Sequence, residues 1–202
     1  MASNSLYQVT VLDLGPSPAL QTLSFPNLTE VIVLQLLELP LLTEFEFGAS
    51  LTLSLSTLID GTGLKSFSLP ADTSNSRYDY ESIFFAIVNN KEMSQIHLGL
   101  KGFIAAAGSG EFTISDNAPG AIIDLPNLIS LNSNTSFGDF SNLNIPRLQV
   151  VNGSLNISNA QVFRFSGPSL QNVDGDFSLT GNFSEYVLIS KLRTITTDGR
   201  SL

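Results

Sequence analysis

Residues that could bind a sugar, or cleave one, gather in a single polar stretch between Ala71 and Ser82 (ADTSNSRYDYES). It holds in succession Arg77, Tyr78, Asp79, Tyr80 and Glu81. Paired carboxylates can act as the acid and base of glycoside hydrolysis, and tyrosine rings offer faces on which a sugar or a peptide can stack. A solvated loop without any chemistry would have the same composition. We therefore interpret these residues as a weak candidate binding site and assign no catalytic residues.

The remaining reactive side chains do not form a recognisable catalytic or metal site. His97 is the only histidine, and because it lies between the apolar Ile96 and Leu98, strand alternation places it on the solvent face. A metal site or a catalytic triad needs further ligands or a paired base. The chain also has no cysteine, which excludes disulfides and thiolate metal sites. We therefore expect no metal, no cofactor and no enzymatic activity.

The charge distribution argues against polyanionic partners. The net charge is −9, and residues 1–64 contain no lysine or arginine. The carboxylates of this segment are Asp13, Glu30, Glu38, Glu44, Glu46 and Asp60. Such a surface repels phosphate backbones and anionic lipids, so we expect no nucleic-acid partner.

Asn-x-Ser/Thr sequons provide potential glycosylation sites if the chain is secreted. They begin at Asn27, Asn134, Asn152, Asn156 and Asn182. Composition alone would give about three such sequons, so the excess is a weak indication of a glycoprotein. Asn152 and Asn156 lie on either side of Ser154, and we do not expect both to be occupied.

No targeting segment is evident in the sequence. Residues 1–15 lack the basic start of a secretory leader, and residues 194–202 are polar, unlike the apolar tail of a GPI signal. The most apolar window, Val31 to Leu42, is too short to span a bilayer and contains Gln35, Glu38 and Pro40. These features predict no signal peptide, no GPI signal and no transmembrane segment within this chain.

The elements that would position these residues repeat along the chain. The motif L-x-x-Φ-x-Φ, where Φ is apolar, recurs at intervals of 22 residues near both ends. Its first residues there are Leu20, Leu42 and Leu64, and again Leu148, Leu170 and Leu192. A proline stands two residues before the leucine of several copies, namely Pro18, Pro26, Pro40, Pro126, Pro146 and Pro168. A fixed period of this length indicates a repeat architecture.

A second motif alternates with the first and consists of a small residue, x-Φ-x-Φ, and Ser or Thr. Its copies begin at Ala49, Gly110, Gly153 and Gly175, with a degenerate copy at Gly138 in which Asn142 replaces an apolar residue. Apolar residues alternating with Ser, Thr or Asn are typical of a strand with one buried and one wet face. Two short strands per repeat become stable only when successive turns stack. The sequence therefore predicts an all-β solenoid of roughly eight turns, spaced at about 4.8 Å.

Some alternatives stay open at this point. We expect one domain spanning residues 1–202, with residues 71–82 as an inserted loop. A β-sandwich is one alternative, because its strands need no fixed period. A leucine-rich-repeat horseshoe is another, because it shares the motif L-x-x-L-x-L. The asparagine that such a repeat has eight residues after its first leucine is found only at Asn156. Residues 82–88 fit either a short helix, begun by Asp79 and Glu81, or another buried strand.

Two pairs of segments resemble the repeats of the fungal GPI-anchored cell-wall organisation proteins, which read like G-x-L-x-I-S-x-N-P and L-P-x-L-x-x-V-x-G. They are residues 110–119 with 125–128, and residues 153–159 with 145–153. The resemblance covers most of the chain from Pro18 to about Ile195. It implies a right-handed β-helix similar to the L-domains of growth-factor receptors. It also implies a non-catalytic, glycosylated cell-surface protein that contributes to wall organisation.

The role that the resemblance implies is that of a scaffold, or of a binder of wall polysaccharide or of a surface protein. The leader, cap cysteines, Ser/Thr-rich stalk and GPI tail of that family are missing from this sequence. The alternatives are therefore an intracellular, cytoplasmic binding module, and a solenoid carbohydrate-active enzyme centred on residues 77–81 with Lys101. The sequence does not indicate an oligomeric state.

Overall fold

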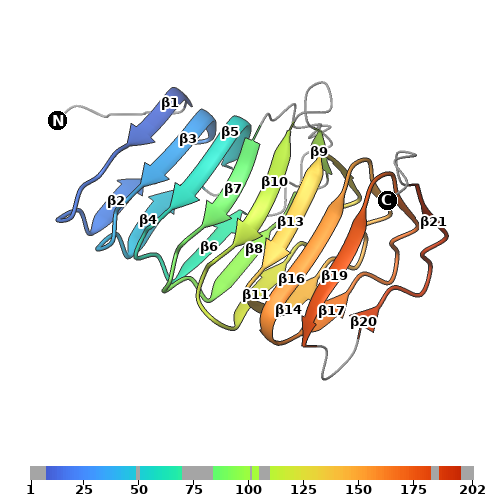
Figure 1. Ribbon diagram of the computed structural model, residues 1–202. Helices are drawn as coiled ribbons and strands as arrows, with labels where there is room; N and C mark the ends of the chain where they lie inside the picture. Colours follow the sequence, from blue (N-terminus) through green and yellow to red (C-terminus); the bar gives the residue numbers. More distant parts are fainter. Residues whose placement is uncertain are drawn as a thin grey trace.

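The computed structural model describes residues 8–48, 51–69, 84–100, 102–104, 110–182 and 187–196. Within these ranges every regular element is a β-strand, and the strands stack as a β-solenoid. Figure 1 shows the turns following one another along one axis, from the blue N-terminal end to the red C-terminal end. The all-β solenoid predicted from the repeat period is confirmed. Among the described residues, no helix is long and apolar enough to cross a membrane.

Three parallel sheets form the sides of the solenoid. The long sheet consists of β1 (Gln8–Leu14), β3 (Glu30–Leu37), β5 (Thr52–Asp60), β7 (Phe84–Val88), β10 (Glu111–Ser115), β13 (Asn134–Gly138), β16 (Leu155–Val162) and β19 (Phe177–Asn182). The second sheet consists of β6 (Ser66–Leu69), β8 (Gln95–Leu98), β11 (Ala121–Asp124), β14 (Phe140–Asn144), β17 (Arg164–Ser166) and β20 (Val187–Leu188). The third sheet consists of β9 (Gly102–Ile104), β12 (Ser130–Asn132), β15 (Val150–Val151), β18 (Asn172–Val173) and β21 (Thr194–Ile195). A separate pair is formed by β2 (Thr22–Phe25) and β4 (Glu44–Phe47).

The turns keep the period that the sequence predicts. Gln8 lies opposite Glu30, 22 residues away, and the same offset relates the partners of β16 and β19. The eight strands of the long sheet bound about seven turns, close to the roughly eight expected. The offset rises to 28 where Thr62 meets Asn90, because the stretch between β6 and β7 is longer. From β9 onward each turn has three strands, one more than the two sequence motifs predict.

The prolines that precede the leucine motif lie in tight turns at the corners of the solenoid. The N–H of Leu28 donates to the carbonyl of Phe25 at 2.9 Å, and the N–H of Leu148 donates to the carbonyl of Ile145 at 3.3 Å. The proline therefore occupies the second position of a β-turn, for which its fixed φ is suited. Each turn carries its leucine into the interior, where Leu28 and Leu148 are fully buried.

The interior is a continuous stack of aliphatic and phenylalanine side chains. Phe85 and Phe112 come from adjacent turns and stack with ring centroids 4.9 Å apart. Phe137, one turn further, packs edge-on against Phe112 at 6.0 Å. Since the strands are parallel and in register, inward residues of one turn cover those of the next. Removal of this apolar surface from water is what makes successive turns stack.

A row of left-handed corners follows the long sheet. The residues just after β3, β5, β7, β10 and β13 have positive φ angles: Glu38 (51°), Gly61 (65°), Asn89 (58°), Asp116 (55°) and Asp139 (55°). Gly, Asn and Asp adopt this conformation at the lowest cost. The corner redirects the chain from the long sheet toward the second sheet.

A buried amide ladder lies directly beyond these corners. The Oδ1 atom of Asn90 accepts the backbone N–H of Thr62 at 2.9 Å. The Nδ2 atom of Asn90 donates to Oδ1 of Asn117 at 3.0 Å, and Nδ2 of Asn117 donates to the carbonyl of Ile87 at 2.9 Å. These side chains are almost fully buried and all have partners. Such a satisfied polar network ties three consecutive turns together.

The structure settles two local questions. Residues 84–88 form strand β7, so the strand interpretation of this segment is confirmed and the helix is wrong. The degenerate copy of the second motif at Gly138 is also wrong, because Gly138 ends β13 and Phe140 begins β14 in a different sheet. The chain turns a corner at Asp139, in the middle of that pattern, and Leu143 faces the core in place of Asn142.

Candidate functional site

The residues singled out from the sequence are not brought together by the described part of the fold. Arg77, Tyr78, Asp79, Tyr80 and Glu81 lie outside the described residues, so their role in binding stays a prediction. His97 lies in β8 with 44% of its side chain exposed, as strand alternation predicts. Within the described ranges, no group of three or more His, Cys, Asp or Glu residues could hold a metal ion.

A different candidate surface lies on the outside of the long sheet, over β10, β13, β16 and β19. The inward residues of these strands, such as Phe112 and Ile157, are fully buried. The outward positions are mainly serine and threonine. We call this surface the hydroxyl face, and it consists of Thr113, Ser115, Ser136, Ser158, Ser178 and Thr180. All of these side chains are at least partly exposed.

The first row of the hydroxyl face runs along the solenoid axis. Thr113 pairs with Ser136, Ser136 pairs with Asn156, and Asn156 pairs with Ser178. Each step is therefore the spacing between neighbouring strands, about 4.8 Å. The row presents short polar side chains at a regular interval.

The second row lies two residues further along each strand, about 6.6 Å away. Gly138 pairs with Ser158, and Ser158 pairs with Thr180. A Cβ atom added to Gly138 would lie 3.2 Å from the Cβ of Ser115, so Ser115 is its neighbour on the other side. The two rows together present hydroxyl groups on neighbouring strands, interrupted by Asn156 in the first row and by Gly138 in the second.

Most of these hydroxyl groups are available to a ligand. Ser115 Oγ donates to the carboxylate of Asp116 at 3.2 Å. The other hydroxyls, those of Thr113, Ser136, Ser158, Ser178 and Thr180, have no hydrogen bond to any group in the part of the chain that the structure describes. A hydroxyl donates one hydrogen bond and accepts two. The face is therefore complementary to another surface that is rich in hydroxyl groups.

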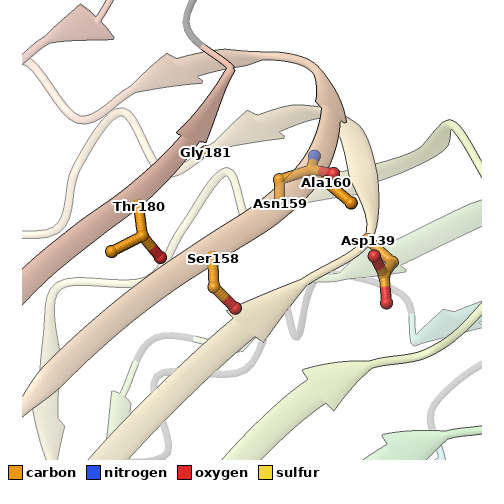
Figure 2. Close-up of a pocket in the computed structure, with 6 residues that line it drawn as sticks. All are labelled: Asp139, Ser158, Asn159, Ala160, Thr180 and Gly181. Atoms are coloured by element: carbon orange, nitrogen blue, oxygen red, sulfur yellow. The ribbon is translucent and has the colours of Figure 1, made fainter.

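A shallow hollow of about 320 Å³ adjoins the second row. Its lining residues are Asp139, Ser158, Asn159, Ala160, Thr180 and Gly181. Figure 2 shows Ser158 and Thr180 side by side on neighbouring strands, with Asp139 across from them. The volume is at the lower limit of ligand pockets, which measure about 300–1,000 Å³. One carboxylate beside two hydroxyls can hydrogen-bond the hydroxyl groups of a sugar residue.

The hollow exists because β16 is irregular at this end. The register between β16 and β19 shifts after Asn159, which lies opposite Gly181. The Nδ2 atom of Asn159 donates a hydrogen bond to the carbonyl oxygen of Phe140, so this side chain has a structural role. Gly181 has a φ of 134°, and any Cβ there would collide with the carbonyl oxygen of Asn159. Glycine at position 181 thus keeps this side of the hollow open.

A second polar row runs along the outside of the second sheet. Ser68, His97, Asp124 and Asn144 follow one another on β6, β8, β11 and β14. His97 Nδ1 lies 2.9 Å from Asp124 Oδ2, and Asn144 Nδ2 donates to Asp124 Oδ1 at 2.8 Å. A Ser–His–Asp triad requires a hydrogen bond between the serine and the histidine. Among the described residues no hydrogen bond joins Ser68 to His97, so this row supplies an ion pair and no activated nucleophile.

The sequon asparagines, Asn27, Asn134, Asn152, Asn156 and Asn182, are all exposed. Two of them are engaged in the fold. The Oδ1 atom of Asn134 accepts the N–H of Ser154 at 3.1 Å, and Nδ2 of Asn152 donates to Oδ1 of Asn132 at 2.6 Å. Asn156 stands inside the hydroxyl face. Glycosylation at these positions stays a prediction.

The signal for the hydroxyl face was present in the second motif, whose outward positions are Ser, Thr or Asn. The missing information was the register. Residues 134–138 (NTSFG) depart from the motif, with Thr135 at its first apolar position and Gly138 in place of the final Ser or Thr, yet they form β13 and supply Ser136 to the first row. The row becomes visible only when strand pairing brings this unmatched segment between β10 and β16.

Comparison with known proteins gives one relevant similarity. No protein-family model matches the chain, and no solved structure matches it. The chain is 29% identical over 163 residues to the cell wall protein ecm33 of Schizosaccharomyces pombe. This alignment covers 79% of the chain but only 35% of that protein, so the chain spans about a third of its relative. That relative is a cell wall protein by name, and the similarity agrees with the family resemblance of the repeats.

Proposed function

We propose that this chain is a non-catalytic cell-wall protein that binds a neutral wall polysaccharide through the hydroxyl face and thereby acts as a scaffold. The observation that carries the proposal is the array of unpartnered hydroxyls on β10, β13, β16 and β19. The similarity to a cell wall protein supports the location in which such a ligand is met.

The geometry suits an extended polymer that lies along the solenoid axis. Each further turn offers the same two outward positions, so a polymer made of similar units meets similar contacts at every turn. A single hydrogen bond contributes only about 0.5–1.5 kcal/mol to binding, because both groups leave water. Several such contacts made by one chain reinforce one another, since the later ones form at a high effective concentration.

The negative charges around the hydroxyl face favour a neutral polymer over an anionic one. Glu111 and Asp176 lie at one edge of the hydroxyl face and Asp139 lies at the other. The whole chain has a net charge of −9. A polysaccharide that carries carboxylates or phosphates would be repelled, whereas a glucan would not.

The test measures retention of the chain on insoluble, protein-free glucan prepared from yeast walls. The double variant Ser136→Lys and Ser178→Lys places two long side chains on the first row and prevents flat contact. Gln95→Lys, on the exposed face of the second sheet, controls for the charge and length of a single added lysine. We expect the double variant to lose retention by about tenfold or more, and Gln95→Lys to bind like the parent.

Equal retention of the double variant and the parent would contradict the proposal. The same samples also test the enzymatic alternative, through the release of soluble sugar. Sugar release that is abolished by Asp79→Asn would replace a scaffold with a hydrolase centred on Arg77 to Glu81.

A further inference from the structure

Asn156 occupies the centre of the first row of the hydroxyl face. Its neighbours on the adjacent strands are Ser136 on one side and Ser178 on the other. Its side chain is exposed and makes no hydrogen bond in the part of the chain described. The side chain to which a glycan would be attached is therefore accessible to solvent, and its amide nitrogen makes no hydrogen bond that stabilises the described fold.

The other sequon asparagines in the same turns are placed differently. Asn134 accepts a backbone N–H at 3.1 Å, and Asn152 uses its amide nitrogen to bind Asn132 at 2.6 Å. A glycan is attached to the amide nitrogen, so at Asn152 it would occupy the atom that contacts the neighbouring turn, whereas at Asn134 it would leave the Oδ1 contact in place. Asn156 can carry a glycan without the loss of any described contact.

The surroundings of Asn156 also leave room for a bulky modification. The flanking side chains in its row are serines, and Ser158, which completes the sequon, is on the same face two residues away. The hydroxyl of Ser158 lines the hollow. A glycan that begins at Asn156 would stand between the first row and this hollow and would cover both.

We propose that Asn156 is a glycan acceptor and that its occupancy closes the hydroxyl face to polysaccharide. The closing effect rests on the proposed function, because it needs a ligand that the bare face binds. Glycosylation would then divide the protein into two populations, one that binds the wall polymer and one that does not. This makes the sequon at Asn156 a regulatory element, whereas a glycan at Asn27, in a turn of the first repeats, leaves the face free.

The experiment compares the chain made in bacteria, without glycans, with the chain directed through the yeast secretory pathway by an added leader. Site occupancy is mapped by mass spectrometry, and retention on insoluble glucan is measured for the parent, Asn156→Gln and Asn27→Gln from both hosts. We expect the yeast-made parent and Asn27→Gln to bind about tenfold less, or weaker still, than the bacterial parent. Asn156→Gln should bind equally well whether it is made in yeast or in bacteria.

The outcomes are distinguishable. If the bacterial parent does not bind, the proposed function fails, and the closing role of Asn156 fails with it. If the bacterial parent binds but the yeast-made chain carries no glycan at Asn156, or carries one and binds equally well, only the inference about Asn156 is overturned. Bacterial Asn156→Gln serves as the unglycosylated reference for the same variant from yeast, so that any effect of the glutamine on the face cancels in the comparison between hosts.

Discussion

The outer surface of the long sheet changes character along the solenoid, whereas its inner surface does not. Over β10 to β19 the first outward row is Thr113, Ser136, Asn156 and Ser178. Toward the N-terminus the same row continues through Ala86, Leu58 and Gln35. The second row likewise changes from hydroxyls to Val88, Asp60 and Leu37. Inward positions are buried in both regions and mainly apolar, with Thr57 and Thr135 as the buried polar residues among them.

This difference separates the demands of folding from those of binding. An inward residue lies over the inward residue of the next turn, so packing limits its type in every repeat. An outward residue contacts only its row neighbours and whatever lies outside, so it can change from one turn to the next. The hydroxyl face is thus a property of the last four strands of the long sheet, on a scaffold that all eight share.

The largest expected effect comes from breaking the inner surface. Val173 is fully buried in β18, and Asn172 next to it is partly exposed. Val173→Asp would bury a carboxylate without a partner and should lower the free energy of unfolding by about 3 kcal/mol or more. Asn172→Asp should change it by less than about 0.5 kcal/mol. Urea unfolding of both variants provides the measurement, and similar midpoints would show that the inward register is wrong.

The next effect concerns the junction between the two regions, where the amide ladder joins β5, β7 and β10. Asn117→Ala removes the acceptor of the Asn90 amide and should cost about 2–3 kcal/mol, because buried donors lose their partners. Asp116→Asn, on the adjacent exposed corner, keeps a residue that tolerates the left-handed conformation and should be nearly neutral. Thermal unfolding followed by circular dichroism compares them, and an unchanged Asn117→Ala would mean that the ladder is not structural.

Extending the hydroxyl face toward the N-terminus would make the outer surfaces of the two regions more alike. The double variant Leu58→Ser and Val88→Thr extends the second row by one turn, beside Ser115, and adds a hydroxyl to the first row two turns beyond Thr113. One or two additional hydrogen bonds should tighten retention on glucan by up to about tenfold. Leu58→Ala with Val88→Ala removes the same apolar atoms without adding hydroxyls and should not bind more tightly. Equal binding of the two double variants would count against a role for the hydroxyls.

The smallest effect is expected on the second sheet. Asp124→Asn removes the ion pair with His97, whose members have side chains 44% and 31% exposed. Water screens a pair of this kind, so the free energy of unfolding should fall by less than about 1 kcal/mol. Glucan retention should not change. A loss of retention in this variant would move the binding surface from the long sheet to the second sheet.

Much of the fold could be predicted from the sequence, because the core repeats at short range. The leucines at positions 148, 170 and 192 mark the period, and the prolines before Leu148 and Leu170 mark the β-turns that bring these two leucines inward. The third strand of the turns from β9 onward was not predicted. β15 and β18 contain only two residues each, and the leucine motif to which they belong also occurs on other sides of the solenoid. A pattern that short does not reveal to which sheet it belongs.

The candidate site was harder to predict, because it depends on alignment across strands. Nothing in the order of residues 134–138 shows that Ser136 lies between Thr113 and Asn156. His97 was correctly placed on the solvent face, but its contact with Asp124 joins residues 27 positions apart. Such contacts follow from the register of neighbouring turns, and the offset from β8 to β11 is 27 residues in place of the 22 that a strict period would assign.

The parallel register of one turn on the next has a mechanical consequence. Since β16 and β19 are held together at an offset of 22 residues, a force that pulls the chain from one end would peel off single turns in sequence. Each step would release about 70 Å of extended chain. The turns joined by Asn90 and Asn117 would resist longest, because side-chain hydrogen bonds reinforce their backbone pairing. A protein built in this way would lengthen in steps under tension and rewind when the tension falls.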